Sequence, residues 1–173
     1  GLHSGKICNV TLLPAAADSG ITFIRKDLQT NNIIPGDYKH IYKSNLCTTL
    51  KANNSDAKVL TVEHLLAAIR GNKIDNVKIE IDSQEIPILD GSSREYDTII
   101  KKVGTCEQKN SYKKFLIIKD KISIKSKNSF FLIEPCNNLQ INCTVDFPSP
   151  IGKQTIKLGK SFSEIYHNVK NAK

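Results

Sequence analysis

The chain has 173 residues, 39% of them hydrophobic, and no apolar run approaches the roughly 20 residues that a membrane-spanning helix needs. Its 25 basic and 17 acidic residues give a formal net charge of +8, but the lysines are dispersed, and six Phe, five Tyr and no Trp leave few rings for stacking on bases. Composition therefore argues against a membrane-spanning protein and against nucleic-acid binding, and the lack of a charged-then-apolar leader adds the expectation of a cytoplasmic location.

The first elements are expected to be two strands joined as a hairpin. Residues Lys6 to Leu13 alternate between polar and apolar side chains, and Ile21 to Arg25 is also strand-like. Pro14 and the Asp18-Ser19-Gly20 run favour a turn between them. The polar, turn-rich stretch from Asn31 to Asn45 is expected to be a connection.

Two short strands are predicted next, at Leu46 to Leu50 and at Ala57 to Leu60, with a turn at Asn53 to Asp56. The second of these strands leads directly into the strongest helix signal in the chain, Thr61 to Gly71. Thr61 is the expected N-cap and Gly71 the expected left-handed residue after the helix, which should begin within one residue of Val62.

The predicted helix has one buried face and one reactive pair of side chains. The buried face follows the i, i+3, i+4, i+7 spacing of an amphipathic helix and comprises Val62, Leu65, Leu66 and Ile69. Glu63 and His64 lie together at its first turn. An imidazole can bind Zn²⁺ and a neighbouring carboxylate can take a proton from water, but on these two residues alone a structural or surface role is the more frequent reading.

A half-buried strand is predicted at Val77 to Asp82, followed by a strand at Glu85 to Leu89. Ser92 or Ser93 is expected to cap a second helix that continues through Val103 and closes at Gly104. Asp90 could serve as a metal ligand, but an Asp-Gly pair ahead of a capping serine favours a turn.

After a polar, lysine-rich segment the pattern changes to short strands. These are expected at 115–118, 122–125, 130–134, 139–147 and 154–158, and a capping box at Ser161 to Glu164 predicts a final helix. The order of elements favours an α+β fold of two layered units, with mixed sheets and helices packed on one face. We predict a first domain at 1–107, a linker at 108–114, and an incomplete second domain at 115–173.

The cysteines are odd in number and widely spaced, without a CxxC pair: Cys8, Cys47, Cys106, Cys136 and Cys143. This pattern is not typical of a zinc ribbon or a disulfide framework, and it predicts reduced thiols. Cys47 has two readings, as a small buried hydrophobe on a strand or as part of a binding pocket, and the first is the more common.

Six stretches in order resemble the bacterial zinc-dependent deacetylases that act on UDP-3-O-acyl-N-acetylglucosamine in lipid A biosynthesis. They are GLHSGK (1–6), TLLPAAADSGITFIRKDL (11–28), LCTTL (46–50), LTVEHLLAAIRG (60–71), IDNVKIEID (74–82) and EIPILDGSS (85–93). The resemblance implies that His64 is a zinc ligand and Glu63 the general base. It also implies that His3 and Cys47 lie at the substrate pocket.

The resemblance also shows what this sequence lacks. The family takes two further zinc ligands from a His-x-x-x-Asp pair, and no histidine of this chain is followed by aspartate at that spacing. We therefore expect only part of the zinc site here, and an inactive fragment. The resemblance implies a hydrolase that removes the N-acetyl group from its UDP-linked substrate; the alternative is a non-catalytic basic α+β module that binds nucleotide or nucleic acid.

Overall fold

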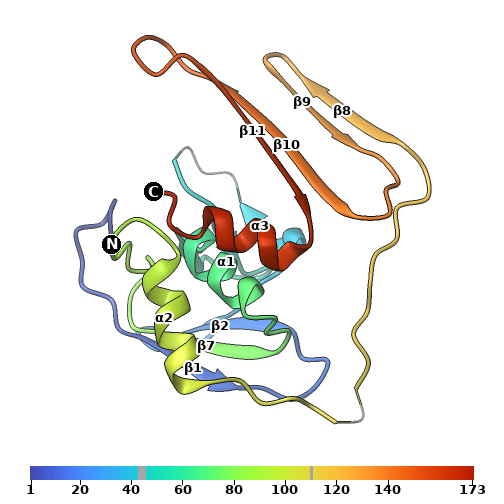
Figure 1. Cartoon of the computed structure of the whole chain (residues 1–173). Helices are drawn as coiled ribbons and strands as arrows, with labels where there is room; N and C mark the ends of the chain where they lie inside the picture. The colour runs from blue at the N-terminus through green and yellow to red at the C-terminus, as the bar shows by residue number, and fades with distance from the viewer. Residues whose placement is uncertain (43–45, 110) are drawn as a thin grey trace. The chain divides into compact units, whose positions relative to one another are not determined.

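The structure is a computed structural model that describes residues 1–42, 46–109 and 111–173. The chain forms two compact units, one made of Gly1–Ser111 with Val169–Lys173 and the other of Tyr112–Asn168 (Figure 1). Helices and mostly antiparallel strands occur together, so the predicted α+β class is confirmed. Every helix of the described residues is too short or too polar to cross a lipid bilayer.

The main sheet of the first unit has the strand order β1-β7-β2-β3, formed by Val10–Pro14, Val77–Ile81, Ile21–Arg25 and Ile33–Pro35. Strand β7 pairs antiparallel with β1 and parallel with β2, so the sheet is mixed as predicted. The predicted hairpin between the first two strands is wrong, because β7 lies between them. Alternate residues of β7 are all buried, and a central position protects both edges of this strand.

A second, three-stranded antiparallel sheet follows the order β4-β5-β6, with strands at Ile41–Tyr42, Thr49–Lys51 and Lys58–Leu60. The last two overlap the strands predicted at 46–50 and 57–60: β5 begins three residues later than predicted and extends to Lys51, and β6 begins one residue later. The stretch 31–45 is more ordered than the expected connection, because it contains β3, the 3-10 helix η1 (Tyr38–His40) and β4. Its last three residues, 43–45, lie outside the described residues.

Helix α1 runs from Glu63 to Gly71 and begins where the sequence predicts. The predicted caps are wrong. Val62 occupies the N-cap position, while Thr61 has a φ of 59° and its hydroxyl donates to Glu85. Gly71 is the last helical residue rather than a left-handed residue after the helix. A buried carboxylate partner thus draws the Thr61 side chain away from the helix end.

Helix α2, Arg94–Val103, ends at Gly104 with a φ of 87°, as predicted. At its start the Ser92 hydroxyl accepts a hydrogen bond from the Arg94 N–H at 3.1 Å. The strand predicted at 85–89 is wrong: the segment makes a single parallel bridge, between Leu60 and Glu85. Farther along, the backbone carbonyl of Pro87 accepts a hydrogen bond from the Tyr96 hydroxyl instead of from the backbone of a neighbouring strand.

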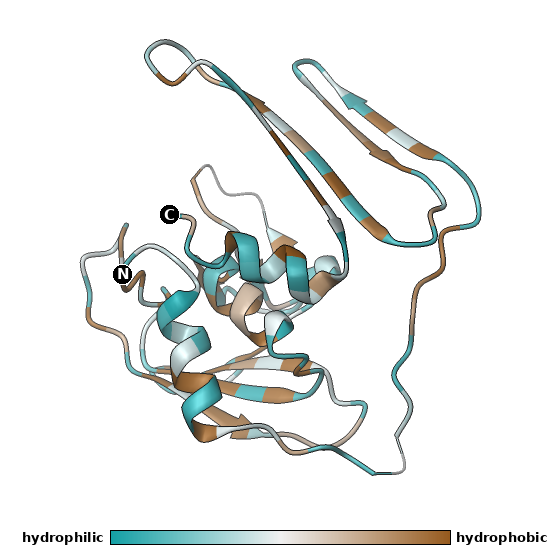
Figure 2. Cartoon of the chain, viewed as in Figure 1, coloured by the Kyte–Doolittle hydropathy of each residue, from teal (hydrophilic) through white to brown (hydrophobic). Residues whose placement is uncertain are grey.

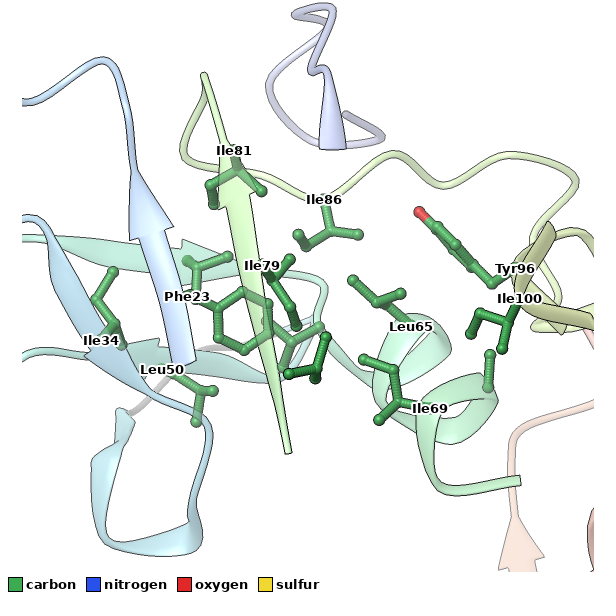
Figure 3. Close-up of a cluster of buried hydrophobic side chains, with 14 of the residues drawn as sticks. Phe23, Ile34, Leu50, Leu65, Ile69, Ile79, Ile81, Ile86, Tyr96 and Ile100 are labelled. Carbon is green, nitrogen blue, oxygen red and sulfur yellow. The ribbon is translucent and has the colours of Figure 1, made fainter. Parts of the chain in front are cut away.

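The core of the first unit lies between the main sheet and the helices. Leu65 and Ile69 of α1 are fully buried and point toward Phe23 and Ile79 of the sheet, and Ile100 of α2 lies beside them (Figure 3). The predicted apolar face of α1 is confirmed, since each of its members is buried or packed against the core: Val62, Leu65, Leu66 and Ile69. This packing fixes the direction in which the first turn of α1 points.

The second unit contains two separate hairpins and all but the last residue of helix α3 (Phe162–Val169). The hairpins pair β8 (Ile122–Ser126) with β9 (Ser129–Ile133), and β10 (Leu139–Asp146) with β11 (Lys153–Lys160), close to the predicted strands. The strand expected at 115–118 does not form. Hydrophobic and hydrophilic residues mix along both hairpins (Figure 2), and nearly all of their side chains are exposed.

Candidate functional site

Helix α1 places the Glu63 carboxylate beside the segment that leads into β5. The Thr48 N–H donates to Glu63 Oε2 at 3.1 Å, and the Val62 N–H donates back to the Thr48 carbonyl at 3.4 Å. Among the described residues, no donor is bonded to the second oxygen, Oε1. Within the described part of the chain, one oxygen of Glu63 is therefore held by backbone and the other has no donor.

Cys47 precedes Thr48, so the same pair of hydrogen bonds brings its segment to the start of α1. Its Sγ lies 3.7 Å from the Thr49 hydroxyl, and the side chain is half-buried just before β5 rather than on a strand. The position suits a pocket wall as well as a packing role.

His3 is exposed, and its loop is hydrogen-bonded to Glu85, which also bonds Thr61 just before α1. The His3 N–H donates to Glu85 Oε1 at 2.9 Å, and the Ser4 N–H donates to Glu85 Oε2 at 2.7 Å. The Thr61 hydroxyl also donates to Glu85 Oε1, at 3.2 Å. His3 and Thr61 thus share one carboxylate oxygen, and Thr61 lies two residues before Glu63.

Glu85 is a residue of this region that the sequence did not single out. Its side chain is fully buried, and burial by itself would raise its pKa. Hydrogen bonds from His3, Ser4 and Thr61 outweigh burial and lower the pKa of Glu85 to about 2. The only signal in the sequence was an acidic residue at the start of the otherwise apolar Glu85 to Leu89 stretch.

His64 follows Glu63 in the first turn of α1 and is half-buried. A hydrolytic zinc ion needs about three protein donors and one open position. In residues 1–42, 46–109 and 111–173 no three His, Cys, Asp or Glu side chains lie together in a way that could hold a metal ion. The described residues therefore do not by themselves fit Zn²⁺, and His64 contributes one donor at most.

Local contacts account for Asp90 and for His40. Asp90 accepts from the Ser92 N–H at 3.0 Å and from the Ser92 hydroxyl at 2.7 Å, so the preferred turn role is confirmed. His40 lies with Nδ1 2.8 Å from Asp37 Oδ1, and its ring beside Asp37 lowers the pKa of that carboxyl.

The sequence was compared with known proteins, and it matches one family along its whole length. The sequence model for UDP-3-O-acyl N-acetylglycosamine deacetylase matches residues 1–173. A UDP-3-O-acyl-N-acetylglucosamine deacetylase of Aliivibrio fischeri is 40% identical over 87% of this chain and 48% of its own length. Proteins of the same name from Haemophilus influenzae (strain PittEE) and Pasteurella multocida are 37% and 38% identical over 94% of this chain and 53% of their own length. The chain thus spans about half the length of these relatives.

Proposed function

Because the chain belongs to the UDP-3-O-acyl N-acetylglycosamine deacetylase family, we propose that it is part of a zinc-dependent hydrolase of lipid A biosynthesis. The substrate is UDP-3-O-acyl-N-acetylglucosamine. Water adds to the acetamide carbonyl, the carbon–nitrogen bond breaks, and acetate and a free amine leave. The proposal covers the whole protein, of which these residues correspond to about half the length of the relatives.

Glu63 is the proposed general base. The observation that carries this role is the unequal environment of its two oxygens, since Oε2 accepts from Thr48 and Oε1 has no donor among the described residues. A carboxylate fixed through one oxygen can present the other to a water molecule without searching for its orientation. The amide cleavage needs such a base, because water must lose a proton as it attacks.

His64 is the proposed zinc ligand of this chain. His64 would hold Zn²⁺ together with donors from elsewhere in the protein, and the ion would supply an acidified water and positive charge near the carbonyl oxygen. The remaining donors would come from parts of the protein other than the described residues. His3 and Cys47 are proposed to line the substrate pocket, because hydrogen bonds join their segments to the residues just before His64.

We also propose a cytoplasmic location. All five cysteines lie in the described part of the chain and none forms a disulfide, which is the usual state in a reducing compartment.

The direct test is an assay of the full-length protein. It is purified with zinc, supplied with UDP-3-O-acyl-N-acetylglucosamine, and acetate release is measured before and after chelation and after zinc is returned. We expect activity that is lost on chelation and restored by zinc. A zinc-loaded protein that releases no acetate contradicts the proposal.

A further inference from the structure

We infer that Glu85 is a positioning residue, which holds the His3 loop and the start of α1 in one fixed arrangement. The inference rests on the proposed function, because it assigns Glu85 a role toward the site that contains Glu63. Glu85 itself contacts neither Glu63 nor His64 through any recorded hydrogen bond among the described residues. Its influence would pass through the segments that it joins.

The first segment is a tight turn that presents two backbone N–H groups to one carboxylate. The Gly5 N–H donates to the Gly1 carbonyl at 3.0 Å and closes the turn, and Gly5 has a φ of 66°. Consecutive N–H groups of His3 and Ser4 then point to the two oxygens of Glu85. This is a backbone concavity suited to an anion, with the anion supplied by the protein itself.

The turn wraps closely around the carboxylate. A Cβ atom added to Gly1 would lie 2.3 Å from both Glu85 Oε2 and Ser4 Oγ, so a side chain at position 1 would have to displace one or both of these groups. Glycine at position 1 thus lets the backbone approach the buried carboxylate closely.

The second segment is the junction between β6 and α1. Leu60 is bonded on both sides to the Glu85 segment, through its N–H to the Gln84 carbonyl at 2.9 Å and through its carbonyl to the Ile86 N–H at 3.1 Å. The next residue, Thr61, has a φ of 59°, which is uncommon for a β-branched residue. Its hydroxyl bonds Glu85 Oε1, so side chain and backbone together hold the bend that leads to Glu63.

The charge of Glu85 is essential to this arrangement. A carboxylate offers only acceptors. The Glu85 carboxylate accepts from three donors, two of them 81 and 82 residues before it in sequence and the third 24 residues before it. Glutamine has nearly the same shape, but its amide group would set an N–H against one of the donors. Glu85→Gln should therefore release one or both segments while leaving the surrounding volume unchanged.

The experiment compares Glu85→Gln with Asp97→Asn in the full-length protein. Asp97 is a matched control, since it is also a buried carboxylate with three donors, which are Asn72, Lys101 and Lys170. Two measurements are made on each variant: amide hydrogen exchange, and kcat with KM for acetate release. If a variant is partly unfolded, its kcat is calculated from the concentration of folded protein.

In Glu85→Gln we expect amide exchange in residues 1–6 and 61–64 to accelerate about tenfold or more, with exchange in β7 unchanged. We expect kcat of the folded enzyme to fall by about tenfold or more as the site geometry loosens, with a smaller effect on KM. Asp97→Asn should leave both the exchange of these segments and kcat at wild-type values.

Unchanged exchange in residues 1–6 and 61–64 overturns the inference, and so does faster exchange with an unchanged kcat. A wild-type protein that lacks deacetylase activity contradicts the proposed function instead. Should Glu85→Gln fail to fold, Thr61→Val removes one donor and is expected to speed exchange at 61–64 and lower kcat, whereas Thr61→Ser keeps the hydroxyl and restores both. Equal behaviour of these two variants also overturns the inference.

Discussion

A carboxylate that takes a proton from water must be held in place and must still have an open oxygen. Glu63 meets both conditions among the described residues, because the Thr48 N–H binds Oε2 and leaves Oε1 without a donor. The position at the first turn of α1 also orients the side chain through the helix and not through a loop. These features make Glu63 the residue whose substitution is most informative about chemistry.

Glu63→Gln in the full-length protein is expected to lower deacetylation by about 10²- to 10⁴-fold, the usual contribution of a general base, while zinc content stays the same. The amide can accept the bond from Thr48 but cannot take a proton from water. Acetate release and metal content are measured together. Glu95→Gln is the matched control, an exposed acid in the first turn of α2, and should have full activity. Full activity in Glu63→Gln would show that another group acts as the base.

Because of Glu85, the free energy of unfolding is expected to depend on pH, and this can be measured without substrate. Its pKa is lowered from 4.5 to about 2 in the folded protein, so its ionised form is favoured by folding. The stability that it contributes is complete above the unfolded pKa of 4.5 and is lost as the pH falls toward 2. The full effect is on the order of 3 kcal/mol.

We expect the free energy of unfolding of the wild type to fall more steeply between pH 5 and pH 3 than that of Glu85→Gln. Urea unfolding at a series of pH values measures this difference. Parallel curves for the two proteins would show that the folded-state pKa of Glu85 is not lowered.

At the scale of elements, helices α1 and α2 are stabilised by the side chains that they bury in the core of the first unit. Neighbouring residues of α2 show the contrast, since Ile100 is 5% exposed and belongs to the core, while Ile99 is 55% exposed. The two positions have the same helical surroundings and the same side chain. Comparing substitutions at these two positions therefore separates the effect of burial on stability from the effect of helix propensity.

Ile100→Ala is expected to lower the free energy of unfolding by about 2–5 kcal/mol, through lost burial and the cavity left behind. Ile99→Ala should change it by less than about 1 kcal/mol, because this side chain remains largely in water. Urea unfolding of both variants gives the comparison. Equal losses would place the two residues in equivalent environments and contradict the packing of α2.

At the scale of the whole molecule, the metal-binding side chains of the described residues do not form a complete zinc site. His64 is the proposed ligand, and no three metal-binding side chains lie together in the described residues. Zinc bound by one protein donor and water is far weaker than zinc bound by three.

The 173-residue chain on its own is therefore expected neither to retain zinc after dialysis against a weak chelator nor to release acetate. Metal analysis of the dialysed chain tests this directly, with the full-length protein as the control that keeps its zinc. One tightly held zinc per chain would mean that residues assigned here to other roles, such as His3 or Cys47, complete a site.

How much of this was predictable from sequence differs from element to element. The start of α1 within one residue of Val62, its buried face and the hairpin strands of the second unit were predicted correctly, because each depends on local periodicity. The placement of Glu63 and His64 in the first turn of α1 was predictable for the same reason. Their proposed roles came from the resemblance to a family.

Only the tertiary structure decided what depends on contacts between distant residues. The insertion of β7 between β1 and β2 follows from the need to cover both edges of its apolar strand, and no local pattern shows which strands do so. Thr61 was expected to cap α1 and instead donates to Glu85, 24 residues away in sequence. The burial of Glu85 is of the same kind, because a carboxylate can be buried only where folding brings donors to it, and here those donors come from segments 81, 82 and 24 residues away.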